Sequence, residues 1–245
     1  MINQATDITM RHEEKYICSE AYLKILESRL NGFLNPDSNQ GEDGYEIRSL
    51  YFDTISDRLY EEGLEGLEQR NKYRIRIYNG STDVIKLEKK TSVRNLKKKK
   101  TVFLEKEYVD YLIDNGEPEE VLKYARGSLM SEFTLLRKTA MLRPKLIVNY
   151  DRKAFVSDIG NVRITLDRNI RVTDKVTDFF GKDTVYHPIL PAGVHLLEVK
   201  YDGVLPGYLT RLLNFQKLER TAFSKYVLGR EKMKDNGRIS EWYEF

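Results

Sequence analysis

Seven stretches of the chain alternate apolar and polar residues with the two-residue period of β-strands. The clearest is Arg70–Tyr78, where Lys72, Arg74 and Arg76 share one face and apolar side chains share the other. Because successive side chains of a strand point to opposite faces, one face of each stretch is charged. The predicted strands are Met10–Ile17, Tyr45–Phe52, Arg70–Tyr78, Val84–Lys90, Leu146–Arg152, Val162–Asp167 and His195–Tyr201.

The charged faces have two interpretations. An antiparallel sheet usually exposes one face to water, and a charged face on any single strand fits that arrangement. Here Arg and Lys recur on strand after strand with an occasional carboxylate, which favours a closed barrel with a charged lumen. The inward cations would repel one another unless a polyanion bound among them, so removal of one cation is not expected to lower thermal stability. The candidate cations are Arg11, Lys15, Arg48, Arg74, Arg76, Lys86, Lys90, Arg152, Arg163, Lys200 and Lys225, and the candidate carboxylates are Glu13, Glu88, Asp167 and Glu198.

Four helical segments are predicted around the strands. Glu20–Leu30 is amphipathic, and Pro206–Leu213 begins with a proline that suits the first turn of a helix. Glu117–Lys138 is helical in interrupted pieces. Ser224 is placed to cap a last helix that runs to about Lys234. Strands and helices together predict the α+β class.

The composition favours one domain over residues 1–245. The 41 Lys and Arg residues against 38 Asp and Glu give a formal net charge of only +3, so no nucleic-acid partner is expected. Cys18 is the only cysteine, which excludes an intramolecular disulfide and favours the cytoplasm. No stretch approaches the ~20 apolar residues of a membrane-spanning helix. We therefore expect no membrane span in this chain, which leaves a membrane-bound partner open.

Eight short motifs occur in order across most of the chain. Each is weak alone, but eight in the same order are specific. Together they resemble the VTC domain, the polyphosphate polymerase branch of the triphosphate tunnel metalloenzymes, which are related to CYTH domains. The motifs are RHEEKY at Arg11–Tyr16, IRSLYFDT at Ile47–Thr54, KYRIRIY at Lys72–Tyr78, IKLEKK at Ile85–Lys90, YDRKAF at Tyr150–Phe155, VRITLDRNIR at Val162–Arg171, LLEVKYDG at Leu196–Gly203 and FSKYVLG at Phe223–Gly229.

The resemblance implies an antiparallel eight-stranded β-tunnel, a closed barrel with flanking helices and a C-terminal helix that closes one end. Substrate phosphates would lie along the tunnel axis, with Mg²⁺ or Mn²⁺ shared between phosphate oxygens and acidic side chains. One departure is informative, because hydrolytic CYTH relatives begin with E-x-E-x-K and this chain has Arg11 in place of the first acid. That exchange removes a carboxylate and adds a phosphate-binding cation, which resembles the polymerase branch.

The implied activity is a metal-dependent polyphosphate polymerase that transfers the γ-phosphate of ATP to a growing polyphosphate chain. The attacking phosphate oxygen is already ionised, so alignment and charge neutralisation carry the catalysis. Arg74 and Arg76 offer two-pronged contacts to neighbouring phosphates, and the resemblance directs Lys225 into the tunnel. We assign catalytic roles to Lys225, Arg74, Arg76 and Glu198, and expect all eleven candidate cations to bind triphosphate or polyphosphate.

Glu198 is the expected metal ligand, because hard divalent cations prefer carboxylate oxygens. Glu13 and Glu88 either assist the metal or balance the charge of the lumen. The segment Lys97–Lys100 either continues a strand, with every second lysine entering the tunnel, or forms a solvated loop. Two other functions stay open: a tunnel triphosphatase that hydrolyses inorganic or nucleoside triphosphate, and a non-catalytic module that binds polyphosphate or an RNA 5′ end.

Overall fold

The computed structural model describes residues 5–7, 11–93, 96–114, 116, 128–213 and 218–241 of the 245-residue chain. The strands are β1 (Ala5–Asp7), β2 (His12–Ser19), β3 (Asn35–Pro36), β4 (Tyr45–Asp53), β5 (Gln69–Tyr78), β6 (Ser81–Val93), β7 (Leu96–Leu104), β8 (Arg143–Ser157), β9 (Val162–Thr173), β10 (His187–Pro188) and β11 (Val194–Tyr201). The helices are α1 (Glu20–Asn31), α2 (Arg58–Leu64), α3 (Lys106–Ile113), α5 (Ser128–Thr139), α6 (Gly207–Leu213) and α7 (Lys225–Glu241), with 3₁₀ turns at Ile159–Asn161 and Val176–Phe180.

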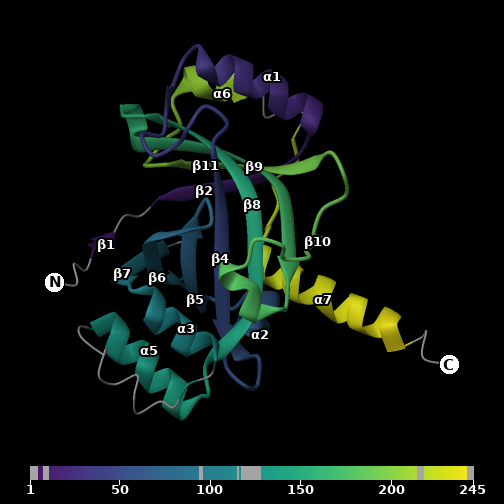
Figure 1. The fold of residues 1–245 in the computed structure, drawn as a ribbon. Helices are drawn as coiled ribbons and strands as arrows, with labels where there is room; N and C mark the ends of the chain where they lie inside the picture. Colours follow the sequence, from purple (N-terminus) through teal and green to yellow (C-terminus); the bar gives the residue numbers. More distant parts are fainter. Residues whose placement is uncertain are drawn as a thin grey trace.

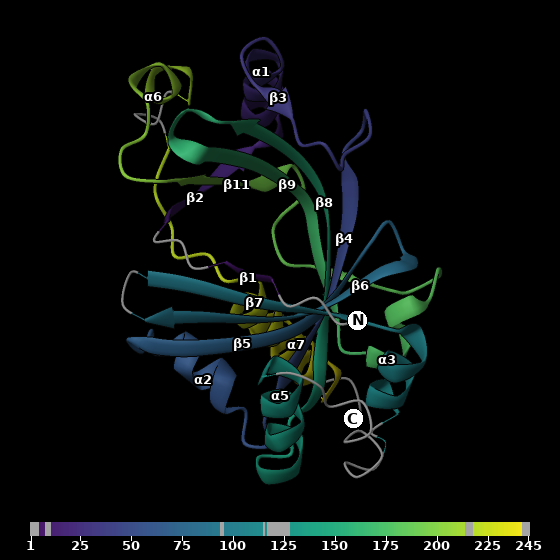
Figure 2. The same ribbon diagram turned by 90° about the vertical axis from the view of Figure 1, so that its left-hand side faces the viewer.

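The strands form one antiparallel sheet in the order β1-β7-β6-β5-β4-β8-β9-β11-β2, with β10 beside β9 and β3 beside β8. Eight strands on this path have eight or more residues. The sheet bends so that β8, β9, β11 and β2 arch over β5, β6 and β7 (Figure 2). The fold class is therefore α+β, built on a strongly curved antiparallel sheet.

Backbone hydrogen bonds do not close this sheet within the part of the chain that the structure describes, so the closed barrel predicted above is not shown. Strand β1 pairs with Lys99–Thr101 of β7 and occupies part of the edge that β2 would need. Side chains join the two ends instead. Glu13 of β2 forms ion pairs of 3.0 Å with both Lys90 of β6 and Lys97 of β7. We call these two ion pairs, which join β2 to β6 and to β7, the seam.

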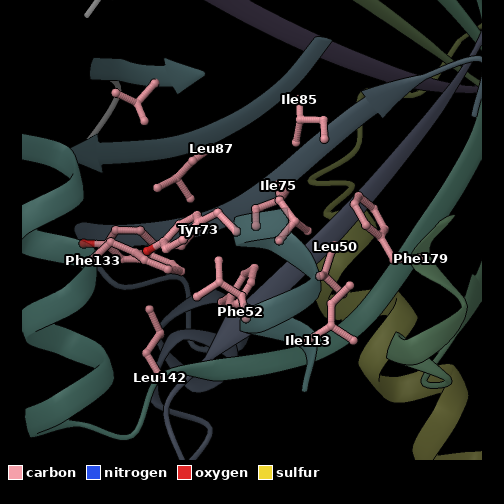
Figure 3. Close-up of a cluster of buried hydrophobic side chains, with 14 of the residues drawn as sticks. Leu50, Phe52, Tyr73, Ile75, Ile85, Leu87, Ile113, Phe133, Leu142 and Phe179 are labelled. Atoms are coloured by element: carbon pink, nitrogen blue, oxygen red, sulfur yellow. The ribbon is translucent and has the colours of Figure 1, made fainter. Parts of the chain in front are cut away.

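Helices cover two opposite sides of the sheet (Figure 1). On the side of β5, β6 and β7, an apolar layer packs against α3 and α5. The ring of Tyr73 lies 6.0 Å from that of Phe133 of α5, and Ile75 and Leu87 belong to the same buried cluster (Figure 3). These side chains are the apolar faces of the predicted strands. Full burial of each large apolar side chain stabilises the fold by about 1.5–3 kcal/mol, so this layer fixes which face of β5 and β6 is left for the lumen.

A second apolar layer places α1 and α6 over β2, β9 and β11 (Figure 1). Leu23 and Leu26 of α1 are buried against Leu197 and Val199 of β11. Ser19 begins the helix by accepting a hydrogen bond from the backbone N–H of Tyr22, as an N-cap residue does. With both outer faces covered by helices, the charged faces of the strands are turned toward the inside of the curve.

Helix α7 packs against β8, β9 and α2. The Tyr226 ring stacks on Tyr51 at 5.0 Å, and its hydroxyl donates to the buried carboxylate of Asp53 at 2.6 Å. Gly229 lies so close to the sheet that a Cβ atom there would meet Leu146 and Val172 below 3.0 Å. The C-terminal helix is therefore docked by specific contacts. No helix in the described ranges has both the length and the apolar character needed to cross a membrane.

All seven predicted strands and three predicted helices are present, with shifted ends. Ser224 caps α7 as expected, since its Oγ accepts from the N–H of Val227 at 3.3 Å. Helix α3 was not predicted, although its buried residues have helical spacing. Of the predicted helix Glu117–Lys138, the part up to residue 127 lies outside the described residues, as does Met10 of the first predicted strand.

Candidate functional site

The charged strand faces surround a cavity of about 1010 Å³. Eleven basic and four acidic side chains line it, so the lumen is strongly positive. Glu13 and Glu88 are two of the acidic residues. The predicted phosphate-binding residues that line it are Arg11, Arg74, Arg76, Lys86, Lys90, Arg152, Arg163 and Lys200.

Strand register arranges the inner faces of β5, β6 and β7 in rows. Paired residues of neighbouring strands lie side by side, and successive rows on one face are about 7 Å apart along the strands. The chemistry of the rows changes along the lumen, from lysine through arginine to an aromatic ring. The lysine row is Lys72, Lys90 and Lys99, the arginine row is Arg74, Glu88 and Thr101, and the aromatic row is Arg76, Lys86 and Phe103.

Arg74 and Arg76 are held by side-chain acceptors of the sheet. Arg74 Nε donates to Glu88 Oε2 at 2.7 Å and its Nη1 donates to the Tyr51 hydroxyl at 3.1 Å, while Arg76 Nε donates to Ser49 Oγ at 3.2 Å. Burial opposes the charge of Glu88, but the two guanidinium groups outweigh it and hold the pKa of Glu88 below its ordinary value. Each guanidinium has five N–H donors, so both keep donors for a ligand.

A second charged centre surrounds Asp167, which is fully buried. Arg152 donates two hydrogen bonds to its carboxylate, from Nε to Oδ1 at 2.6 Å and from Nη2 to Oδ2 at 2.7 Å. Lys225, the first residue of α7, reaches the same carboxylate at 2.7 Å and lies over the Tyr150 ring at 4.6 Å. Burial raises the pKa of Asp167, but Arg152 and Lys225 outweigh it and lower the pKa overall. The last helix thus brings a lysine to Asp167, the carboxylate that also holds the cavity-lining Arg152.

A lysine cluster fills the region around Glu13. Burial, which outweighs the attraction of Glu13, lowers the pKa of Lys90 to about 7. Burial and neighbouring cations also lower the pKa of Lys72 to about 7, and its Nζ donates to Ser224 Oγ at 2.8 Å. Each of these ammonium groups is therefore poised to lose its proton near neutral pH, and a bound anion would keep it charged.

Glu13 and Glu198 are the carboxylates best placed for a divalent metal. The ammonium of Lys15 lies 3.2 Å from Glu13 and 3.7 Å from Glu198, so the space between the two carboxylates already attracts a cation. Within the described ranges, no group of three or more His, Cys, Asp or Glu side chains is arranged to hold a metal ion. Two carboxylates nevertheless fit magnesium or manganese when substrate phosphates and water supply the other ligands. Glu88 is engaged by Arg74 instead.

Three predicted phosphate-binding residues do not line the cavity: Arg48, Lys15 and Lys225. Lys15 Nζ donates to the carbonyl of Phe223, and Lys225 joins the Asp167 centre. Arg48 faces away from the lumen, because its Nη1 donates to the carbonyls of Phe179 and Gly181 at 3.0 and 2.6 Å. Its role in the structure is to fasten a loop to the outside of β4.

The strand interpretation of Lys97–Lys100 is confirmed, because the segment lies in β7. Lys97 contacts Glu13 at 3.0 Å and Lys99 contacts Glu88 at 3.7 Å, as expected of one face of a strand. Lys98 also lines the cavity, so the expected restriction to every second lysine is not strict. The sequence did not distinguish this strand from a loop because four consecutive lysines contain no apolar position that reveals the period.

Some lumen residues were missed by the sequence interpretation. Tyr51 accepts from Arg74, the Tyr150 hydroxyl lies 3.5 Å from Arg76, and Tyr45 accepts from Arg163 at 3.1 Å. The sequence interpretation took only Arg48 and Arg152 from β4 and β8 and assigned none of the tyrosines to the site, although Tyr45 and Tyr51 share strand parity with each other and not with Arg48. Lys72 was placed on the inner face of its strand but was not assigned to the site.

Comparison with solved structures shows the fold. A "putative adenylate cyclase" from Bacillus halodurans is 14% identical with a TM-score of 0.53, over 89% of this chain and 95% of that one. A "putative adenylyl cyclase" from Hippeastrum, described as having a dominant triphosphatase activity, is 13% identical with a TM-score of 0.52, over 90% of this chain and 95% of that one. Identities this low indicate a shared tunnel fold alone. Comparison with curated proteins gives no match.

A comparison with protein-family models is more specific than the structural likeness. The VTC domain model matches residues 10–234, which include every strand of the sheet except β1 and all of the charged rows. The ordered motifs of the sequence and the positive lumen agree with this match. The chain belongs to the VTC domain family.

Proposed function

We propose that this chain is a metal-dependent polyphosphate polymerase that transfers the γ-phosphoryl group of ATP to a growing polyphosphate chain. The observation that carries the proposal is the lumen, in which eleven basic side chains line one cavity of about 1010 Å³. So dense a positive charge favours a linear polyanion as its ligand. The Hippeastrum protein of similar fold is described as a triphosphatase, which supports phosphate chains as the substrate class.

The arginine residues would bind the phosphates of the donor. Arg74 and Arg76 lie two residues apart on β5, on one face, so their guanidinium groups are spaced along the direction in which a phosphate chain would run. A guanidinium donates two parallel hydrogen bonds to a phosphate, which fixes its orientation as well as its position. Arg152 and Arg163 extend the basic lining onto β8 and β9.

Transfer would form a bond between the terminal oxygen of the acceptor chain and the γ-phosphorus, and would break the bond to the β-phosphate oxygen, so that ADP leaves. The acceptor oxygen is ionised at neutral pH and needs no general base. Lys225 would offset charge on the transferring group, because its ammonium is already fixed beside the lumen by Asp167. The lowered pKa values of Glu13, Glu88, Asp167 and Glu198 make these carboxylates weak bases.

A divalent ion, Mg²⁺ or Mn²⁺, would be held by Glu198 and Glu13 together with phosphate oxygens. When bound, such an ion neutralises phosphate charge and orients the chain. Burial opposes ionisation of Glu198, but Lys200 and Lys15 outweigh it and keep the pKa well below its usual range. The carboxylate is therefore ionised and able to bind a metal, and the two lysines that neutralise it become available to phosphate.

Hydrolysis of a triphosphate is the second candidate function. Lys72 and Lys90, with pKa values of about 7, are the lumen groups best matched to accept a proton from an attacking water. Against this, both lie in a cation cluster in which phosphate binding would keep them protonated. The two functions have different products from the same substrate.

The test is incubation of the purified chain with ATP and either Mn²⁺ or Mg²⁺, with products separated on a polyphosphate-resolving gel and ADP and orthophosphate measured in the same samples. A ladder of polyphosphate with matching ADP supports the polymerase. Orthophosphate equal to ADP, without a ladder, assigns the hydrolase. Binding of tripolyphosphate with neither product assigns the non-catalytic module.

A further inference from the structure

Tyr226 connects two side chains to which the proposed function gives catalytic roles. It is the second residue of α7, directly after Lys225, and it is buried. Its ring stacks on that of Tyr51, with centroids 5.0 Å apart and planes 17° apart. The Tyr51 hydroxyl accepts a hydrogen bond from Arg74 Nη1 at 3.1 Å. Tyr226 is therefore one residue along the chain from Lys225 and one ring contact away from the tyrosine that holds Arg74.

The Tyr226 hydroxyl is fixed both as a donor and as an acceptor. It donates to Asp53 Oδ2 at 2.6 Å and accepts from Arg230 Nη1 at 3.0 Å. Asp53 is fully buried and also accepts hydrogen bonds of 2.7–2.9 Å from three backbone N–H groups of residues 54–60. A carboxylate held by so many backbone donors is rigid, so the hydroxyl ties α7 to a fixed point at the end of β4.

Arg230 of α7 extends this anchor to α2 and β8. Its Nη1 and Nη2 donate to the two oxygens of Asp57 at 3.0 and 2.6 Å. Asp57 also accepts from Lys145 of β8 at 2.8 Å. The backbone of Asp57 has φ of 55°, a left-handed conformation that a non-glycine residue adopts where its surroundings hold it there. One network of side chains thus fixes the start of α7 against both elements.

We propose that Tyr226 is a positioning residue for phosphoryl transfer, which fixes the place of Lys225 relative to Arg74. This inference rests on the proposed function, in which both cations act on the phosphates. Asp167 of β9 and Glu88 of β6 hold the charged ends of the two side chains. Tyr226 holds the part of α7 from which Lys225 extends, and holds it against the strand whose Tyr51 contacts Arg74.

The expected effect of this residue is on the rate of transfer rather than on binding. Tyr226 lies outside the lining of the cavity, so it acts through its neighbours. A misplacement of about 1 Å in a catalytic group can lower a rate about 100-fold. Tyr226→Phe keeps the ring that stacks on Tyr51 and removes only the hydroxyl, so α7 stays docked while its anchor to Asp53 is lost. The arginines that bind the phosphates stay in place.

The test measures ADP release over a range of ATP concentrations, and calorimetric affinity for tripolyphosphate, in wild type, Tyr226→Phe, Lys225→Gln and the double variant. Tyr226→Phe should lower kcat by roughly fivefold to fiftyfold and leave KM and tripolyphosphate affinity within about threefold. The double variant should turn over within about twofold of Lys225→Gln alone, because a residue that acts through Lys225 then has nothing left to position.

Two further variants separate positioning from a general loss of stability. Tyr60→Phe is the matched control, since Tyr60 is a buried tyrosine of α2 whose ring lies 5.3 Å from the Arg230 guanidinium, and kcat should stay at the wild-type value. Arg230→Lys keeps the charge and loses the two-pronged contact with Asp57, so it should lower kcat in the same direction as Tyr226→Phe with KM unchanged. All rates are measured well below the melting temperature of each variant.

A wild-type kcat in both Tyr226→Phe and Arg230→Lys would overturn the positioning role while leaving the proposed function intact. A double variant slower than Lys225→Gln by the full effect of Tyr226→Phe would also overturn it, because the tyrosine would then act independently of Lys225. So would an equal loss of kcat in Tyr60→Phe. If wild type forms neither polyphosphate nor ADP, the proposed function is refuted, and this inference with it.

Discussion

Arg74 and Glu88 are paired directly across β5 and β6 and are joined by a hydrogen bond of 2.7 Å from Nε to Oε2. Arg76 lies 3.8 Å from the same carboxylate oxygen, so it is the weaker partner. Repulsion among lumen cations by itself predicts no loss of stability when one is removed. The pairing with a buried carboxylate reverses that expectation for Arg74 and not for Arg76.

Replacing Arg74 with Ala should lower the free energy of unfolding by about 1–3 kcal/mol, because Glu88 loses its closest partner while staying buried. Arg76→Ala is the matched comparison and should cost less. Melting curves without ligand measure both. Equal melting temperatures for the two variants would mean that the Arg74–Glu88 contact contributes nothing beyond the average lumen charge.

The same two variants should each lose about tenfold to a hundredfold in affinity for tripolyphosphate, since each removes charge-assisted hydrogen bonds. Arg→Lys at either position should restore only part of the loss, because lysine keeps the charge and lacks the two-pronged contact. Titration calorimetry provides the affinities. Wild-type binding by both Ala variants would show that this face is not the phosphate site.

Lys225→Gln should lower turnover by about 100-fold or more while leaving ATP binding within severalfold, because the ammonium acts on the transferring group. The fold should persist, since Arg152 still neutralises Asp167. Lys234→Gln is the matched control, as Lys234 lies on the same helix and contacts Tyr60 outside the cavity. The measurement is ADP release over a range of ATP concentrations. Equal effects of the two substitutions would remove Lys225 from the reaction.

Glu198→Gln keeps the volume of the side chain and removes its charge, so metal-dependent turnover should be abolished while the far-ultraviolet spectrum stays unchanged. Activity is measured across a titration with Mn²⁺ and with Mg²⁺. Glu88→Gln serves as the comparison, because that carboxylate is engaged by Arg74 and should leave the metal requirement in place. A wild-type metal dependence in Glu198→Gln would exclude Glu198 as a ligand.

Affinity for tripolyphosphate should fall as pH rises through about 7, because Lys90 loses its proton in that range. Lys90→Arg stays charged, so the ratio of wild-type to variant affinity should fall by about tenfold between pH 6 and 8.5. Using the ratio cancels the ionisation of the ligand itself. The charged groups that act on Lys90 are Glu13, Lys15, Lys97 and Lys200.

Lys90 affects stability without ligand in the opposite direction to its effect on affinity, because stability should rise with pH whereas affinity should fall. The folded-state pKa of about 7 lies below the unfolded value of about 10.4, so the unfolded chain binds more protons between these pH values. Stability contributed by this site therefore rises as pH increases above 7. A flat affinity ratio together with a flat stability difference between wild type and Lys90→Gln would contradict the lowered pKa.

The sequence predicted those parts of the fold whose period is visible in the side chains. In β5 the strict alternation of apolar and basic residues gives both the strand and its inner face, and the structure agrees. In β4 the residue pattern did not identify the inner face. The hydroxyls of Tyr45 and Tyr51 accept hydrogen bonds from lumen arginines, whereas Arg48 lies on the outer face. Residue type alone did not show which face of β4 is inner.

The closure of the sheet was beyond the sequence for a different reason. Closure depends on which strand pairs with the outer edge of β7, and the three residues of β1 occupy part of that edge. A strand of three residues is too short to show the alternation of apolar and polar residues that identifies a strand from sequence. The lowered pKa of Lys72 is likewise a property of the assembled lumen, because it depends on burial and on cations that come from other positions along the chain.

The seam differs from the rest of the sheet in the kind of interaction that holds it, because it consists of ion pairs between side chains. Separating two adjacent strands on the path breaks a ladder of backbone hydrogen bonds. Separating β2 from β6 and β7, in the part of the chain that the structure describes, breaks the side-chain ion pairs of Glu13 and no such ladder. Such contacts weaken with ionic strength and can be exchanged for contacts with another anion. An anion that binds Lys90 or Lys97 would compete with Glu13 for the same ammonium groups. The consequence is that salt and polyanions act on this one contact between the sheet edges, whereas the hydrogen-bonded strand pairs are insulated from both.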